Sequence, residues 1–326
     1  MLGGKKVLHY LLKGNYPVIA SIGLLAAFAG TCFFTAKCIN LLPRDAGREF
    51  AHDGKLSAGK PRGAGIIFIL VFVLSALLFA PLNLEIIIYL ILTVVEMLTG
   101  YMDDASQRPW GELKKGLLDL MVAVILTFTF LNFNSSTIEI VTLGISVAIP
   151  EVLFGILTIA LVWGSINVTN CSDGVDGLSG TLAIVTLGTF YLIDHIKGNH
   201  DEFTFLILMF IICILGYLWY NAAPSRLLMG DAGSRAMGIF ISIVALKSKS
   251  PLMYIPAAIV FIFDGGLGLL KVGLIRVFKI HILKNVRTPL HDHVRKALGW
   301  SNTQTVFRYA IIQIVVSMAV VYLLLI

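Results

Sequence analysis

The chain has 326 residues, of which 57% are hydrophobic and only 13% are charged, about half the charged share of a soluble domain. A soluble fold of this length does not hide so much apolar surface, so composition excludes a soluble enzyme, a fibre and a disordered chain. The formal net charge of +6 is modest, and we expect no nucleic-acid partner.

Apolar segments of about 20 residues, the length that spans a bilayer, recur along the whole chain. They predict an all-α polytopic membrane protein with about ten transmembrane helices, in a single integral-membrane domain over residues 1–326. The first residues, with Lys5, Lys6 and Lys13, are expected to lie in the membrane interface. The predicted spans are Tyr16–Leu42, Gly63–Ala80, Leu84–Gly100, Leu113–Leu131, Glu151–Ile166, Ser179–Ile196, Phe203–Tyr220, Ala236–Leu246, Tyr254–Phe278 and Thr305–Ile326.

Two stretches depart from this pattern. Asn132–Pro150 is polar at its start and then β-branched, which predicts a small extracytoplasmic β-hairpin. The long ninth span contains Gly265 and Gly266, where we expect the helix to bend; close helix packing through these small residues is the alternative. Asp264 and Lys271 share a face of this span, about 10 Å apart in a straight helix, which is too far for an ion pair.

Lys and Arg are concentrated in the loops that follow the odd-numbered spans. The positive-inside rule places these loops in the cytoplasm and both termini outside, although the basic N-terminal residues favour the opposite orientation. Four polar clusters fall in the same loops, and polar groups are costly enough in membrane proteins to mark function. The clusters are Asp103-Asp104, Asn167–Leu178, Met229–Ser234 and Thr288–Lys296.

Each cluster has a structural alternative: a solvated helix end, a turn-rich loop, or a helix N-cap at Asp231. Together, however, they place hard oxygen donors and cationic side chains on one face. Mg²⁺ binds through one or two carboxylates plus substrate phosphates, so this equipment fits phosphoryl transfer. A GxxxxGK[ST] loop and an HExxH zinc motif are both absent from the sequence, and the four scattered cysteines are expected to pack as apolar residues.

The motifs resemble those of the polyprenyl-phosphate N-acetylhexosamine-1-phosphate transferases, in family order and over nearly the whole chain. Asp103-Asp104 matches the aspartate pair of that family, and Asn170-x-x-Asp173-Gly-x-Asp176-Gly-Leu its NxxDGxDGL loop. Met229-Gly-Asp231-x-Gly-Ser matches its MGDxGS loop, and Pro289-x-His291-x-His293 its histidine motif. The histidine motif, followed by Gly299-Trp300, favours the muramoyl branch of the family.

The sequence departs from the family pattern in two places. Asp292 stands where the family has the middle one of three consecutive histidines. The GTPTMGG segment of the family appears only as Gly59–Gly65. These departures leave open whether His291 or His293 touches substrate, and whether Lys55 or Lys60 takes the role of the family lysine.

The resemblance implies a bacterial cytoplasmic-membrane enzyme and its reaction. Undecaprenyl phosphate attacks UDP-N-acetylmuramoyl-pentapeptide, giving lipid I and UMP, with Mg²⁺ required. It also implies a homodimer, and a bent ninth helix beside a groove for the polyprenyl chain. The implied catalytic residues are Asp103, Asp104, Asp231 (the metal ligand), His291 and His293; the implied substrate-binding residues are Lys55, Lys60, Lys115, Asn167, Asn170, Asp173, Asp176 and Gly230.

Two alternatives stay open at this point. A sibling enzyme that loads N-acetylglucosamine-1-phosphate onto the same lipid carries similar motifs. A transporter or flippase would use Asn167–Leu178 as a broken-helix site, but transporters place charges near the bilayer midplane in two related halves. Direct attack is favoured over a covalent aspartyl intermediate, because an anionic phosphate oxygen needs little activation beyond charge neutralisation.

Overall fold

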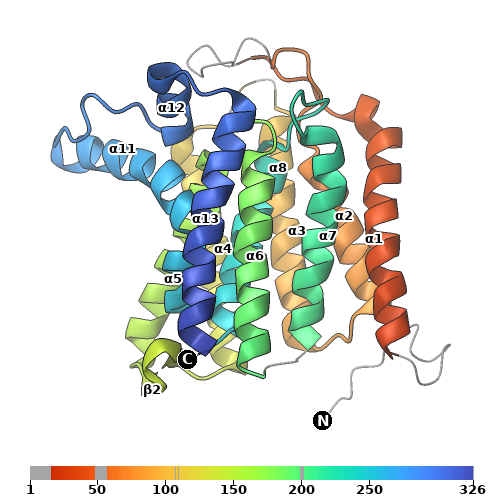
Figure 1. Cartoon of the computed structure of the whole chain (residues 1–326), viewed down its shortest axis with the longest axis vertical. Coiled ribbons are helices and arrows are strands. Elements are labelled where there is room, and N and C mark those ends of the chain that lie inside the picture. The colour runs from red at the N-terminus through yellow and green to blue at the C-terminus, as the bar shows by residue number, and fades with distance from the viewer. Residues whose placement is uncertain (1–15, 48–56, 107, 109, 199–201, 326) are drawn as a thin grey trace.

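The computed structural model describes residues 16–47, 57–106, 108, 110–198 and 202–325. Within them the chain is a bundle of membrane-length helices, as the apolar runs predict (Figure 1). Seven described helices are long and apolar enough to cross a membrane, and a bent pair makes an eighth. The chain is therefore a multi-pass membrane protein. These helices are α1 (Tyr16–Cys38), α3 (Leu84–Asp104), α4 (Glu112–Phe133), α5 (Glu151–Cys171), α6 (Leu178–Ile196), α7 (Glu202–Asn221), α13 (Asn302–Leu325) and the α9–α11 pair.

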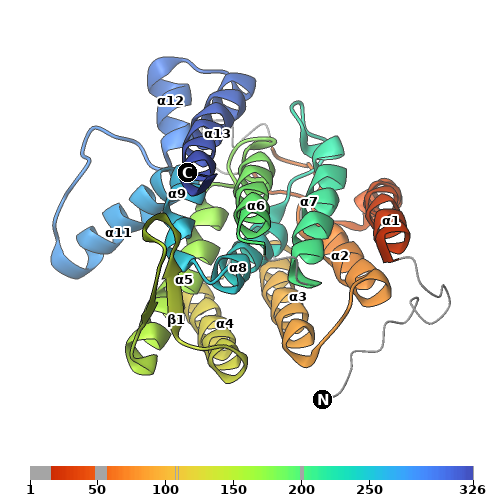
Figure 2. The ribbon, with the colours of Figure 1, turned by 60° about the horizontal axis from the view of Figure 1, so that its bottom comes forward.

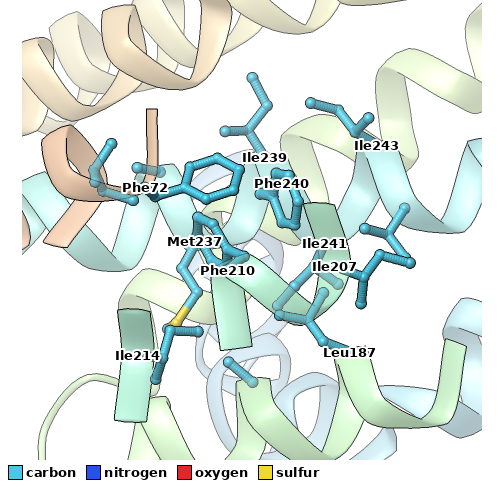
Figure 3. Packing of buried hydrophobic residues seen from close by; sticks show 14 of the residues in the cluster. Phe72, Leu187, Ile207, Phe210, Ile214, Met237, Ile239, Phe240, Ile241 and Ile243 are labelled. Atoms are coloured by element: carbon cyan, nitrogen blue, oxygen red, sulfur yellow. The ribbon is translucent and has the colours of Figure 1, made fainter. Parts of the chain in front are cut away.

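The remaining two predicted spans are also helices, but they are shorter or more polar. Helix α2 (Gly65–Phe79) has 15 residues. Helix α8 (Gly230–Lys247) lies in the middle of the bundle, where α3, α5 and α6 surround it (Figure 2). Phe240 of α8 stacks on Phe210 of α7 with ring centroids 4.1 Å apart, and Phe72 of α2 packs edge-on against both rings (Figure 3).

The predicted hairpin is present. Strands β1 (Thr137–Ile140) and β2 (Ile145–Ala148) pair antiparallel, with Thr137 opposite Ala148. Gly144, in the turn, has a φ of 63°, which glycine adopts without strain. The hairpin, the start of α1 and the end of α13 all lie at one end of the bundle (Figure 1), which we call the hairpin end. Helix α3 ends and α8 begins at the opposite end, which we call the site end.

The ninth span bends at a different place from the one predicted. The 70° break lies between α9 (Tyr254–Ala257) and the following helix, at Ala258, not at Gly265-Gly266. Gln313 of α13 bonds the backbone on both sides of the break, donating to the Pro256 carbonyl (3.0 Å) and accepting from the Val260 N–H (3.1 Å).

The two glycines lie instead in a π-helical turn, Ile262–Gly266, between α10 (Ile259–Phe261) and α11 (Leu267–Phe278). Gly265 permits close packing, since a Cβ there would lie 2.3 Å from the Val168 carbonyl of α5. Lys271 does not approach Asp264; it donates to the carbonyls of Leu283 and Val286 (3.1 and 2.9 Å). It thereby anchors the segment after α11, which diverges from the bundle (Figure 1).

Three predicted loop motifs prove to be helical. Helix α5 runs on to Cys171, so Asn167 and Asn170 lie in its last turns. Helix α8 begins six residues before the predicted span, which places Asp231 in its first turn. His291 and His293 open a helix that the sequence did not predict, α12 (Leu290–Leu298), which ends at Gly299 with a left-handed φ of 68°.

Candidate active site

Three aspartates from two helices meet at the site end around two cationic side chains. Asp103 and Asp104 close α3, and Asp231 opens α8. The Lys115 ammonium contacts Asp103 and lies 2.9 Å from Asp231 Oδ2. The Arg62 guanidinium lies 2.8 Å from Asp104 Oδ1 and 3.2 Å from Asp231 Oδ1. We call these five residues the charge cluster; its three carboxylates face two cations.

Asp104 has a specific structural task in this cluster. Its Oδ1 accepts the Asp231 N–H (3.1 Å) and its Oδ2 accepts the Ala232 N–H (3.0 Å). It therefore caps α8 from another helix, because the first N–H groups of a helix have no partner within it. The N-cap that the sequence suggested at Asp231 is supplied by Asp104 instead.

Helices α2, α3 and α8 approach closely enough for these contacts because small residues lie where they cross. A Cβ on Gly100 of α3 would lie 2.4 Å from the carbonyl of Asp231, and one on Gly65 of α2 would lie 2.0 Å from the Gly233 nitrogen. Backbone hydrogen bonds from Ala64 and Gly65 to the Leu228 and Met229 carbonyls join the two N-termini. The position of Asp231 is thus fixed by backbone contact with α2 and α3.

Arg62 is the residue of the cluster that sequence reasoning did not identify as functional. In the sequence it is one basic loop residue among many, within the Gly59–Gly65 segment. Burial by itself lowers the pKa of its guanidinium, but the surrounding carboxylates, led by Asp104 and Asp231 with Asp45 beside them, raise it above the usual value. Arg62 is therefore a permanent cation, and the signal in the sequence was an arginine directly before small residues.

A cavity of about 720 Å³ opens beside the charge cluster. Arg62 and Gly230 line it, and the aspartates of the cluster lie behind Arg62. Most of its other walls come from three of the four polar motifs and from the Gly59–Gly65 segment, which contribute Lys60, Asp173, Asp176, His291 and Arg295; Arg287 lies just before the last motif and also lines the cavity. Such a volume and polar lining suit a charged ligand of nucleotide size.

The loop after α5 presents two of the cavity carboxylates. Ser179 Oγ donates to Asp173 (2.7 Å), and the Ser225 N–H donates to Asp176 (3.1 Å). Lys60 Nζ lies 3.6 Å from Asp176 and donates to Ser225 Oγ (3.0 Å). Lys60 thus faces the cavity, whereas Lys55 falls outside the described residues.

His291 reaches the cavity with one ring nitrogen fixed from behind. Asp264, in the π-helical turn, accepts from the His291 N–H (2.7 Å) and lies 2.8 Å from Nδ1. Nε2 points toward Gly174, where an added Cβ would lie 2.2 Å away. An Nδ1–H donated to a carboxylate leaves Nε2 as the nitrogen that meets a ligand. The sequence named Asp264 but did not connect it with His291, because the two lie on different helices.

The other residues of the histidine motif point elsewhere. His293 Nδ1 accepts the Arg287 N–H (3.4 Å) and does not line the cavity. Asp292 lines the cavity and binds Arg295 (2.7 Å). Of the two histidines, His291 is the one placed to touch a ligand there.

Three predicted substrate residues do not line the cavity. Lys115 belongs to the charge cluster. Asn170 donates to Ser234 Oγ (2.9 Å), which ties α5 to α8. Asn167 donates to Asp119 Oδ2 (3.2 Å) and to the Trp163 carbonyl (2.9 Å).

The residues present suit a hard cation that arrives with its substrate. Within the described part of the chain, no three His, Cys, Asp or Glu side chains form a ready metal site. Asp103 and Asp231 nevertheless converge on one cation, the Lys115 ammonium. Two carboxylate ligands completed by phosphate and water match the preference of Mg²⁺.

The chain is similar to known proteins of one transferase family. Residues 86–249 match the model of the family described as glycosyl transferase family 4. Similar proteins named phospho-N-acetylmuramoyl-pentapeptide-transferase occur in Treponema pallidum (38% identity over 93% of this chain and 89% of the relative) and in Symbiobacterium thermophilum (30% identity over 86% and 88%). A third, in Nautilia profundicola, is 26% identical over 92% of each chain.

Proposed function

Because this chain belongs to glycosyl transferase family 4 and, within it, to the phospho-N-acetylmuramoyl-pentapeptide-transferases, we propose that it transfers phospho-N-acetylmuramoyl-pentapeptide from its UDP donor to undecaprenyl phosphate. The products are lipid I and UMP, and the step belongs to peptidoglycan synthesis. Family membership makes the chain a phospho-sugar transferase, so the alternative hypothesis of a transporter is not pursued.

One observation carries the proposal: the charge cluster adjoins a polar cavity at one end of an apolar bundle. A water-soluble nucleotide-sugar reaches such a cavity from the aqueous side, and a lipid phosphate reaches the same place from the membrane. Two anionic phosphate groups must approach each other in this reaction. Arg62 and Lys115 supply the positive charge that makes the approach favourable.

The chemical step is a displacement at phosphorus. An oxygen of the lipid phosphate forms a bond to the sugar-linked phosphorus of the donor, the P–O bond of the diphosphate bridge breaks, and UMP leaves with the electron pair. Mg²⁺, held by Asp231 and Asp103, would neutralise the charge of the diphosphate. Asp103 orients the lipid phosphate or takes its proton, and Arg62 binds the charge that develops. The attacking oxygen is already anionic, so no covalent intermediate is needed.

The remaining residues divide between donor binding and support. Asp173, Asp176 and Lys60 bind the uridine diphosphate part in the cavity, and His291 Nε2 binds a donor phosphate or the sugar. Gly230 lines the cavity with its backbone, and its lack of a Cβ lets Asp104 approach, since a Cβ there would lie 2.2 Å from Asp104 Oδ2. Asp104, whose oxygens are bonded to α8, acts as a positioning residue. Asn167, Asn170 and His293 keep a supporting role in this scheme.

The proposed location is the bacterial cytoplasmic membrane, with the site end in the cytoplasm and both termini outside. A reporter enzyme fused after the last residue, active only outside the cytoplasm, tests the orientation. We also propose a homodimer, on the family resemblance; the mass of the protein in detergent, measured by light scattering, tests it.

The activity itself is tested with purified protein, undecaprenyl phosphate and Mg²⁺. UDP-N-acetylmuramoyl-pentapeptide and UDP-N-acetylglucosamine are offered separately, and UMP release is followed. We expect UMP from the muramoyl donor alone, with loss of activity in EDTA and in Asp231→Ala. Glu139→Gln is the matched control, because its carboxylate pairs with Lys197 at the hairpin end.

UMP from the glucosamine donor instead would keep the chemistry and move the chain to the sibling branch. Folded protein that releases no UMP from either donor would contradict the proposal.

A further inference from the structure

A second group of buried charges lies inside the bundle beneath the charge cluster. The Arg235 guanidinium of α8 contacts Asp119 of α4, and its Nε donates to Glu96 Oε1 of α3 (3.0 Å). All three residues are at most 2% exposed. Asn167 adds a hydrogen bond to Asp119. We call Arg235, Glu96 and Asp119 the buried triad.

The triad repeats the charge cluster one level deeper, on the same three helices. Arg235 follows Asp231 by four residues and Asp119 follows Lys115 by four, which is about one helical turn, or 6 Å, on the same face. Glu96 precedes Asp103 by seven residues, about two turns. Each triad residue is therefore fixed by its own helix to one member of the charge cluster.

Burying these charges is not an obvious way to stabilise the bundle. Replacing a buried ionic triad by apolar residues is often neutral or stabilising, because desolvation offsets the attraction between the charges. Helix α8 already has extensive apolar packing around Phe240 (Figure 3). Apolar packing does not fix the relative orientation of two helices as closely as an ionic contact does. The planar guanidinium of Arg235 bonds carboxylates on two helices, and these bonds are directional.

We propose that Arg235 is a positioning residue for the transferase reaction, and this rests on the function proposed above. By bonding Glu96 and Asp119 at once, it fixes the rotation and height of α8 against α3 and α4. Asp231, one turn away, is thereby held at the spacing from Asp103 and Lys115 that the reaction requires. Loss of the fork moves Asp231 without touching any ligand-binding side chain.

Two variants test this in the full-length protein. Arg235→Lys keeps the charge but offers one ammonium in place of a fork. Glu96→Gln/Asp119→Asn/Arg235→Met removes all three charges together, so no carboxylate is left buried and unpaired. The matched control is Lys247→Met, which breaks an ion pair of α8 with Glu85 of α3 (3.0 Å) at the hairpin end.

We expect both variants to lower kcat for UMP release by about 10- to 100-fold, the effect of misplacing reacting groups by up to 1 Å. The donor KM stays within about threefold, because the cavity residues are unchanged, and the triple variant keeps its melting temperature. A wild-type kcat in Arg235→Lys, or in a folded triple variant, would overturn the proposal. Lys247→Met should keep kcat even if it melts earlier.

Hydrogen exchange separates this inference from the proposed function. Amide protection of residues 230–235 should fall in Arg235→Lys and stay normal in Lys247→Met, whether or not the wild type releases UMP. Unchanged protection in Arg235→Lys refutes the positioning role. Absence of UMP from the wild type, with reduced protection in the variant, refutes only the assigned reaction.

Discussion

Replacing Gly100 by alanine adds one methyl group where α3 crosses α8. The new Cβ would lie 2.4 Å from the carbonyl carbon and oxygen of Asp231 and 2.6 Å from the Ala232 nitrogen. Ordinary contact begins at 3.4 Å, so the two backbones must separate by about 1 Å. The atoms met by the methyl group are backbone atoms, which cannot rotate away as a side chain can.

The separation acts directly on the charge cluster, because Asp231 moves away from Asp103 and Lys115. A shift of this size lowers kcat by about 100-fold. The overpacking costs about 1–3 kcal/mol of stability, of which the better helix propensity of alanine offsets about 1 kcal/mol. The Gly100→Ala protein is therefore expected to fold, to bind donor with a nearly normal KM, and to turn over slowly.

UMP release measured beside two alanine controls checks this reasoning. Gly164→Ala, in α5, places its Cβ in open space and should behave as wild type. Gly216→Ala, in α7, meets the Thr31 Cβ at 2.7 Å and should lower the melting temperature while keeping kcat. A Gly100→Ala protein with kcat within threefold of wild type would show that the spacing between α3 and α8 does not control Asp231.

Three further outcomes are expected from the same UMP assay. Arg62→Met should lower kcat/KM more than 100-fold, because three buried carboxylates then face only Lys115 and a charge-assisted contact to the phosphate is lost. Arg62→Lys should recover part of the lost kcat/KM. A wild-type kcat/KM in Arg62→Met would remove Arg62 from the mechanism. Asp264→Asn and His291→Ala should each reduce kcat/KM by about 10- to 100-fold. The double variant should lose no more activity than His291→Ala alone, because Asp264 acts through His291. Additive losses in the double variant would contradict this coupling. Gly174→Ala should raise the donor KM by displacing His291 from the cavity, and an unchanged KM would mean that His291 does not meet the donor.

The sequence predicted the helices well because each span depends on local composition. Runs of apolar residues with few charges identify α1, α3 and α7 regardless of their neighbours. The start of α8 was not predicted, because it depends on a contact with another helix and not on local composition. Gly230 and Gly233 are poor helix formers, and the first turn of this helix is capped by Asp104 from another helix.

In the site, too, the features that depend on local sequence were predicted, and those that depend on tertiary contacts were not. Asp176 and His291, which belong to motifs visible in the sequence, line the cavity, although the helix that carries His291 was not predicted. Arg62 and Asp264 gained their roles only from tertiary contacts with residues far away in the chain. The bend of the ninth span was placed at the glycines because Gln313, which bonds both sides of the break at Ala258, lies about 55 residues further on.

The arrangement of α3 and α8 also explains why the charge cluster lies where it does. Two carboxylates at the C-terminal end of α3 oppose the dipole of that helix. Asp104 also lies at the N-terminal end of α8, where it accepts two of the free N–H groups, and Asp103 is linked to Asp231 there through Lys115. The N-terminal end of α8 therefore compensates for the C-terminal end of α3 at Asp104, whereas Asp103 is held by the Lys115 ammonium and by the Trp110 N–H (2.6 Å). Arg62 and Lys115 balance the three carboxylates from both sides, since each cation pairs with one carboxylate of α3 and with Asp231 of α8.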